Sequence, residues 1–317
     1  MSRSGRGRDG NLSPVDRRDD VTLLDGGMGQ ELLRRADAEP TPLWSAQVMI
    51  DQPDLVREAH EDFIAAGADV ITVNTYTATR CRLGPAGIER DYERLQTLAC
   101  ELATAARRDH DVLIAGCLSP YGWTYRPDLA PPFEELWPQY AETAALQAPH
   151  VDLILCETMG SLDEARAAVT GASTTGKPVW VSWTLLDDDT ARLRSGERLA
   201  DAVEAMRELE PAAMLVNCSV PESLSAAVAT LAAGGVPFGA YANGFAHIVD
   251  DYAPGAVTTV LGQRHDLDPV RYADAALEWV EQGATIIGGC CEIGPEHIAE
   301  LARRLGRDEP APRTPVS

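Results

Sequence analysis

The sequence predicts an α/β protein of one domain, a (β/α)8 barrel. Strand-like and helix-like segments alternate along almost the whole chain of 317 residues, and they yield eight strands, most of them followed by a helix. The strand-like segments are largely continuous apolar runs, as expected when both faces of a parallel sheet are covered. Eight such units within about 250–300 residues are typical of a closed barrel.

A doubly wound open sheet is the competing arrangement. The dinucleotide-binding form of that fold carries a G-x-G-x-x-G turn after its first strand. The glycines that follow the first strand here, in DGGMGQ (25–30), do not match that turn. We therefore favour the barrel.

The predicted strands are short and apolar. The first, VTLLD, ends at Asp25, and the last, ATIIGG, ends in a pair of glycines. A helix-end glycine leads into a strand in both AAGADVITV and EQGATIIGG, which is the repetition that successive βα units produce. In chain order, the strands are expected at 21–25, 68–74, 112–117, 151–157, 178–184, 212–218, 236–243 and 284–289.

The predicted helices lie between the strands and show apolar residues at helical spacing. In the helix that begins at Pro53, for example, Leu55, Ala59 and Phe63 recur every fourth residue. Pro138 is expected to interrupt one helix, because proline lacks the backbone donor that the helix interior needs. The helices are expected at 53–67, 89–108, 133–147, 161–170, 198–208, 221–233, 268–282 and 295–305.

Composition restricts the partners and the location of the protein. The formal charge of −22 argues against nucleic acid or an anionic membrane surface as the main partner. No apolar run approaches the roughly 20 residues of a membrane span, and the polar start lacks the apolar stretch of a secretory signal. We expect a cytoplasmic protein with a folded domain at 21–305 and flexible tails at 1–20 and 306–317. A homo-oligomer is compatible with the sequence.

Several reactive side chains stand where predicted strands end, which is where barrel enzymes carry out their chemistry. Three of the seven cysteines are among them, after strands six and eight. Only strand seven separates those two strands in a closed barrel, so the three sulfurs can converge at one rim. The strand-end residues are Asp25, Asn74, Cys117, Glu157, Thr184, Cys218, Asn243 and the pair Cys290–Cys291.

Three interpretations of these cysteines are open from the residues alone. The cysteines can be small core residues, although the glycines before Cys290 indicate a backbone crowded around something. A disulfide between Cys290 and Cys291 would be strained, because adjacent Cα atoms lie only about 3.8 Å apart. The third interpretation is a metal site with three thiolates and a vacant fourth position, and thiolate ligands favour zinc.

Several motifs resemble the homocysteine S-methyltransferase family. They are DGGMG near the start, LWSAQVMIDQPDLVREAHEDFIAAGAD, the later VNCS, and GGCC followed by PEHI. The resemblance extends from Val21 to Leu305, which is nearly the whole folded part. It implies a (β/α)8 barrel, in agreement with the count of strands, and a zinc-dependent enzyme that methylates the thiol of homocysteine to give methionine.

The resemblance also implies roles for particular residues. Cys218, Cys290 and Cys291 would bind Zn2+, with the homocysteine thiol as the fourth ligand, and Glu157 would receive the homocysteine ammonium. The other candidate substrate-binding residues are Asp25, Gly26, Gly27, Tyr76, Thr184 and Asn217. Each of the polar candidates also has a plain structural interpretation, as a helix-terminal carboxylate, a turn residue, a rim aromatic or a buried group bonded to backbone.

Two stretches depart from the family pattern. After strand seven many relatives carry Y-P-N-S-G-E, whereas this chain has YANGFAHI (241–248) without a carboxylate. After the cysteines an arginine and two threonines are common in the family, whereas Glu292, Ile293 and Gly294 stand here. The stretch LWSAQVMIDQPDLVREAHEDF is closer to the users of S-methylmethionine and S-adenosylmethionine than to the betaine enzymes. We therefore expect a small sulfonium compound as the methyl donor.

Two other functions compete with this one. A free-standing homocysteine module could take its methyl group from betaine, or from a corrinoid or folate partner, although a complete cobalamin-dependent methionine synthase does not fit in 317 residues. A barrel with a purely structural zinc would need a fourth protein ligand, for which His247 and His297 are the candidates.

Overall fold

Eight parallel strands form one sheet in the computed structural model, which describes residues 20–36, 39, 41–248 and 261–307. Around the sheet the strands follow one another as β1-β8-β7-β6-β5-β4-β3-β2. All eight predicted strands are present; β3 and β4 are shifted by one and two residues toward the C-terminus, and the other six are shorter than predicted. They are β1 (Thr22–Leu23), β2 (Val70–Thr72), β3 (Leu113–Leu118), β4 (Leu153–Met159), β5 (Val179–Trp183), β6 (Ala213–Asn217), β7 (Phe238–Ala242) and β8 (Ile286–Gly289).

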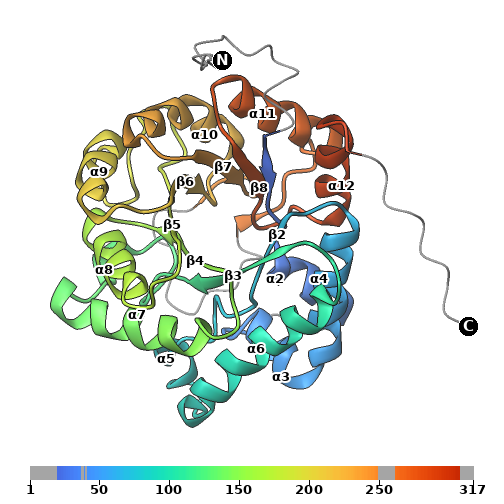
Figure 1. Cartoon of the computed structure of the whole chain (residues 1–317), viewed down its shortest axis with the longest axis vertical. Helices are drawn as coiled ribbons and strands as arrows, with labels where there is room; N and C mark the ends of the chain where they lie inside the picture. Colours follow the sequence, from blue (N-terminus) through green and yellow to red (C-terminus); the bar gives the residue numbers. More distant parts are fainter. Residues whose placement is uncertain (1–19, 37–38, 40, 249–260, 308–317) are drawn as a thin grey trace, which may run out of the picture.

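The sheet closes on itself between β1 and β2. Leu24 and Val70 form a parallel bridge, the amide of Asp25 donates to the carbonyl of Val70 at 2.9 Å, and the amide of Asp69 donates to the carbonyl of Leu23 at 2.7 Å. Figure 1 looks down the resulting ring of strands, with the helices outside it. The predicted (β/α)8 barrel is confirmed, and the doubly wound alternative is wrong.

Helices surround the strands and cover their outer face (Figure 1). Three of them, α2, α3 and α5, were not predicted, and the predicted helix 221–233 consists of α10 followed by a 3-10 segment. The α-helices are α2 (Met28–Ala36), α3 (Ser45–Asp51), α4 (Pro53–Ala65), α5 (Arg80–Leu83), α6 (Tyr92–Arg107), α7 (Phe133–Gln147), α8 (Leu162–Ser173), α9 (Leu199–Met206), α10 (Pro221–Ala227), α11 (Pro269–Glu281) and α12 (Pro295–Arg304). The 3-10 helices are η1 (Glu89–Asp91), η2 (Pro127–Leu129), η3 (Arg207–Leu209) and η4 (Val228–Gly234).

The predicted interruption at Pro138 is wrong, because α7 runs through this proline without a break. Pro138 lies in the second turn of the helix, and both it and Glu134, whose carbonyl it leaves without a donor, are exposed. Water can therefore satisfy that carbonyl. The opposite face of α7 buries Leu136, Tyr140 and Ala144, and this packing keeps the helix continuous.

The apolar core has two layers. The larger one lies between the strands and the helices, and includes fully buried residues such as Phe63, Trp183 and Trp279. The smaller one fills the inside of the barrel, where Leu24, Val70, Ala115, Leu153, Leu155, Ala213, Leu215, Tyr241 and Ile286 meet. The interior is thus packed with side chains, and ligands are restricted to its mouth. No helix within the described ranges is long and apolar enough to cross a membrane.

Arg307 reinforces the seam between β1 and β2 from the C-terminal end of the described chain. Its guanidinium donates to the carbonyls of Val21 at 2.7 Å and Gly67 at 2.9 Å, and to both carboxylate oxygens of Asp69. Asp69 in turn accepts from the amide of Leu23 at 2.7 Å. The expected tails at 1–20 and 306–317 fall outside the described residues, apart from positions 20, 306 and 307.

We predict that Arg307→Met lowers the free energy of unfolding by about 1.5 kcal/mol, since the lost hydrogen bonds involve charged groups but are partly exposed. Urea denaturation of the purified protein measures this. Arg207→Met, which removes an exposed pair between Arg207 and Glu204 within one helical turn, is the control and should cost at most about 0.5 kcal/mol. Equal losses in the two variants would show that the seam does not depend on Arg307.

Candidate metal centre and substrate pocket

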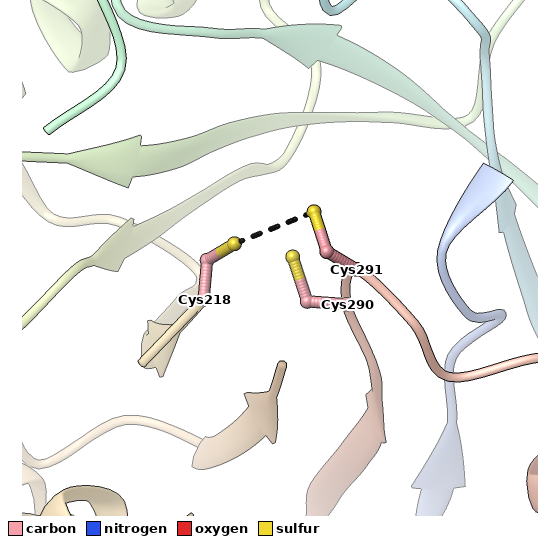
Figure 2. A group of neighbouring side chains, drawn as sticks. All are labelled: Cys218, Cys290 and Cys291. Carbon is pink, nitrogen blue, oxygen red and sulfur yellow. Dashed lines mark hydrogen bonds between the residues drawn. The ribbon is translucent and has the colours of Figure 1, made fainter. Parts of the chain in front are cut away.

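Three cysteine sulfurs meet at the mouth of the barrel. Cys218 directly follows β6, and Cys290 and Cys291 follow β8, with β7 between the two strands. The three Sγ atoms lie within 4.8 Å of one another. Figure 2 shows them pointing toward a common centre, and Sγ of Cys218 is 3.8 Å from Sγ of Cys291. The predicted convergence of the cysteines is confirmed.

The backbone turns sharply to bring these sulfurs together. Cys218 has a φ of 50°, and Glu292, which directly follows Cys291, has a φ of 66°. Residues with a side chain rarely adopt this region. The amides of Cys218 and Cys290 donate to the carbonyls of Tyr241 and Ala242 at the end of β7, at 3.1 and 2.8 Å. The intervening strand thus holds both cysteine segments in register.

A glycine on the neighbouring β1–α2 turn allows this close packing. A methyl group at Gly27 would stand 2.5 Å from the carbonyl oxygen of Cys290, well inside van der Waals contact. The amide of Gly27 donates to the carbonyl of Ile293 at 2.8 Å. Only glycine lets the β1–α2 turn lie against the cysteine turn in this way.

The three thiols form no disulfide, and hydrogen bonds among them shift one another's pKa values. Burial raises the pKa of Cys218, but hydrogen bonds from the Cys290 and Cys291 thiols and from the Tyr125 hydroxyl outweigh burial, and the net pKa is well below its ordinary value. Hydrogen bonding to Cys218 raises the pKa values of Cys290 and Cys291 well above the ordinary value. One thiolate is therefore stabilised at the expense of the other two. Ionisation of all three requires a cation among them.

The spacing fits a tetrahedral metal ion. A metal–sulfur distance of about 2.3 Å gives sulfur–sulfur separations of about 3.8 Å in a tetrahedron, as observed for Cys218 and Cys291. Within the described part of the chain, no fourth metal-binding side chain joins the three cysteines. His247 is exposed, and the ring of His297 lies between the amide of Gly294 and the carbonyl of Leu267. Among the described residues, the structural-zinc alternative therefore lacks the fourth ligand that it needs.

A pocket opens beside the cysteines and encloses about 1020 Å³, including its open mouth. Asp25, Gly26, Gly27, Tyr76 and Glu157, all predicted from the sequence, line it together with the three cysteines. The pocket therefore connects the cysteine cluster with the carboxyl groups of Asp25 and Glu157.

Two buried carboxyl groups face this pocket. Burial raises the pKa of Asp25 to about 8, and the charge of Glu157 adds to the shift, whereas the amide of Thr72, which donates to Asp25 at 2.7 Å, opposes it. Burial also raises the pKa of Glu157 to about 7, against a hydrogen bond from the Cys117 thiol at 3.0 Å. Both groups are poised to ionise when a cation enters the pocket.

Thr184 and Asn217 do not line the pocket and lie behind the cysteine turn. The hydroxyl of Thr184 donates to the carbonyl of Cys218 at 3.2 Å. The side-chain oxygen of Asn217 accepts from the amide of Thr158 at 2.9 Å and from the Ser182 hydroxyl at 2.8 Å. Its amide group donates to the Thr158 hydroxyl at 2.8 Å. The structure thus gives both residues contacts that support the backbone next to Glu157 and Cys218.

Tyr125 is the main pocket residue that the sequence analysis missed. Its hydroxyl lies 3.0 Å from the sulfur of Cys218, and it reaches that sulfur from the loop after β3. Trp44, Tyr241 and Phe245 add further aromatic surface to the pocket. The only sequence signal for Tyr125 is its place in YGWTYRP, a loop at the face where the strands end.

These features define a barrel protein with three cysteines that could hold a metal ion, beside a pocket that contains two buried carboxyl groups. Comparison with known proteins identifies the family. A family model described as homocysteine S-methyltransferase matches residues 22–305. The homocysteine S-methyltransferase of Escherichia coli (strain K12) is 31% identical over 308 residues, which cover 90% of this chain and 95% of that protein.

Two further comparisons agree. Homocysteine S-methyltransferase YbgG of Bacillus subtilis (strain 168) is 28% identical, over 89% of this chain and 93% of that protein. The crystal structure of the metallated form of the homocysteine methyltransferase MmuM from Escherichia coli superposes with a TM-score of 0.74 at 27% identity, covering 92% of this chain and all of that one. This chain therefore belongs to the homocysteine S-methyltransferase family and is an enzyme of that class, as its motifs predicted.

Proposed function

We propose that the enzyme transfers a methyl group from a sulfonium donor, S-methylmethionine or S-adenosylmethionine, to the thiol of homocysteine held at a zinc centre. The observation that carries the proposal is the group of three cysteine sulfurs beside a pocket with two buried carboxyl groups. Because no fourth ligand stands among the described residues, the remaining position suits a substrate thiol, and the carboxyl groups suit an ammonium.

We assign zinc to Cys218, Cys290 and Cys291, because an all-sulfur tetrahedral set favours that ion. When bound, zinc keeps the substrate thiol deprotonated at neutral pH, and three thiolate ligands leave it a weak enough Lewis acid for that sulfur to stay nucleophilic. The Tyr125 hydroxyl, 3.0 Å from Cys218, holds this ligand in place.

Glu157 is assigned to the ammonium of homocysteine. It lies near the end of β4 and lines the pocket. Burial raises the pKa of its carboxyl group to about 7, and an incoming positive charge would stabilise the ionised form of this group. Asp25, Gly26 and Gly27 line the same pocket, and we assign them to the amino-acid site.

The transfer is an in-line displacement at the methyl carbon. The electron pair of the homocysteine thiolate forms the new carbon–sulfur bond, and the pair of the breaking bond remains on the donor sulfur, which leaves as a neutral thioether. The thiol proton is released to solvent before this step. The donor cation loses its charge, so the aromatic faces of Tyr241 and Phe245 are suited to bind it before transfer and release the product afterwards.

The seven cysteines are all free, and an activity that depends on thiolates requires that they stay reduced. These points support a reducing compartment, and we assign the enzyme to the cytoplasm.

The first prediction from the proposed function concerns metal content. The protein purified with zinc should hold about one zinc per chain, and Cys290→Ala and Cys291→Ala should each lose it, because two thiolates do not hold the ion tightly. Inductively coupled plasma mass spectrometry measures the metal, and circular dichroism checks the fold. Cys81→Ala, outside the cluster, is the control and should keep its zinc. Full retention in both cluster variants would refute the assignment.

The second concerns Glu157. Glu157→Gln should reduce kcat/KM for homocysteine about 10- to 150-fold, the value of a hydrogen bond to a charged group, with little effect on an alkyl thiol that lacks the amino group. In the unmodified enzyme, KM for homocysteine should rise as the pH falls below about 7, because protonation of Glu157 removes its charge. Equal losses for both thiols would assign Glu157 another role.

The third tests the function as a whole. The purified single protein should form methionine from homocysteine and S-methylmethionine or S-adenosylmethionine, because a sulfonium methyl group needs only alignment with the attacking sulfur. Product formation is followed by mass spectrometry with a deuterated methyl group in the donor. Turnover with betaine or a methyl-corrinoid protein, and with neither sulfonium, would refute the donor and leave the rest of the site assignment standing.

A further inference from the structure

Arg82 is the only basic residue among the described residues that line the pocket. It lies on the short helix α5, which follows β2. One guanidinium nitrogen donates to the Thr124 hydroxyl at 3.2 Å, and the guanidinium carbon lies 5.0 Å from the centre of the Trp123 ring. The Thr124 hydroxyl also bonds to that of Tyr76 at 3.1 Å. The guanidinium is therefore held in a defined position at the pocket wall.

Unlike most arginines in the described part of the chain, Arg82 has no carboxylate partner among the described residues. The chain has 49 acidic residues against 27 lysines and arginines, and most arginines in the described part are paired with one of them. Arg80, on the same helix, pairs with Glu142. No carboxylate of the described residues lies within ion-pairing distance of Arg82. A guanidinium has five N–H donors, so most of those of Arg82 remain for a ligand.

The direction of the transfer places the donor near Arg82. An in-line displacement requires the leaving sulfur on the far side of the methyl group from the attacking sulfur. The attacking sulfur lies at the cysteines, after β6 and β8. The cysteine segments flank β7, which stands opposite β3 in the strand order around the barrel. Thr124 follows β3, and Arg82 follows the neighbouring strand β2. The body of the donor therefore extends toward the wall that carries Arg82, Thr124 and Tyr76.

We propose that Arg82 binds the carboxylate of the methyl donor, so that the enzyme selects sulfonium compounds derived from an amino acid. This inference rests on the proposed function. Arginine recognises carboxylates with two parallel N–H donors, and its stack on Trp123 and its bond to Thr124 reduce the entropy lost when a ligand binds. In the proposed site homocysteine is held by the cysteines and Glu157, which line the same pocket as Arg82.

Equilibrium binding tests the proposal without turnover. Isothermal titration calorimetry measures the affinity of the full-length, zinc-loaded protein for S-methylmethionine and for trimethylsulfonium, which carries no carboxylate. Arg82→Met should bind S-methylmethionine about 10- to 150-fold more weakly, as expected for loss of a charge-assisted contact, and should bind trimethylsulfonium as the unmodified protein does. Arg80→Met removes one positive charge from the same helix and is the matched control, with unchanged affinity for both.

The opposite results are equally clear. Unchanged binding of S-methylmethionine to Arg82→Met, an equal loss in Arg80→Met, or no binding of S-methylmethionine to the unmodified protein would each overturn the proposal. In steady-state assays, a rise in KM for homocysteine instead of the donor would assign Arg82 to the acceptor and also overturn it. Binding that depends on Arg82 in a protein that turns over no sulfonium would support the site and refute the proposed function.

Discussion

Everything in the site depends on holding three cysteine sulfurs within 4.8 Å of one another. Without a cation only Cys218 is favoured in its ionised form, because ionised thiols repel one another in a buried site. The fold imposes this arrangement through the backbone: Cys218 and Glu292 adopt positive φ values, and β7 fixes the amides of Cys218 and Cys290. Strain at this turn is maintained by the barrel around it, and a bound cation relieves the repulsion.

Acidic groups also line the pocket beside the cysteines. Asp25 and Glu157 add two buried carboxyl groups with raised pKa values, and Arg82 is the only basic residue along the walls that the structure describes. Such a pocket is complete only when positive charge enters it. A metal ion, the ammonium of an amino acid and a sulfonium would supply that charge at three separate places, and the neutral thioether product would leave with less attraction than the donor had.

A network behind the pocket links its two halves. Asn217 bonds to the backbone and side chain of Thr158 and to Ser182. Thr158 follows Glu157, and Cys218 follows Asn217, and both Thr158 and Cys218 have positive φ. Thr184 supports the same turn through the carbonyl of Cys218. These buried bonds set the distance between the carboxyl group of Glu157 and the sulfur of Cys218, which homocysteine would span in the proposed site.

The sequence by itself determined the architecture and the three cysteines that meet at the mouth of the barrel. Alternating apolar strands and amphipathic helices specify a barrel, and the strand-end rule selects Cys218, Cys290 and Cys291, because both are local patterns. Asp25 and Glu157 stand out for the same reason. These local patterns could not predict that α7 continues through Pro138, because its continuity depends on which face of the helix is exposed.

Only the tertiary structure decided how side chains from distant segments meet. Tyr125 reaches Cys218 from a loop 93 residues earlier in the chain, and no spacing rule connects them. Thr184 and Asn217 look like pocket residues at their strand ends, but their side chains turn to backbone groups behind the cysteines. Arg82 differs from its neighbour Arg80 only in what each side chain faces. Such contacts arise from the closure of the barrel and the orientation of each side chain, which the order of residues along one segment does not contain.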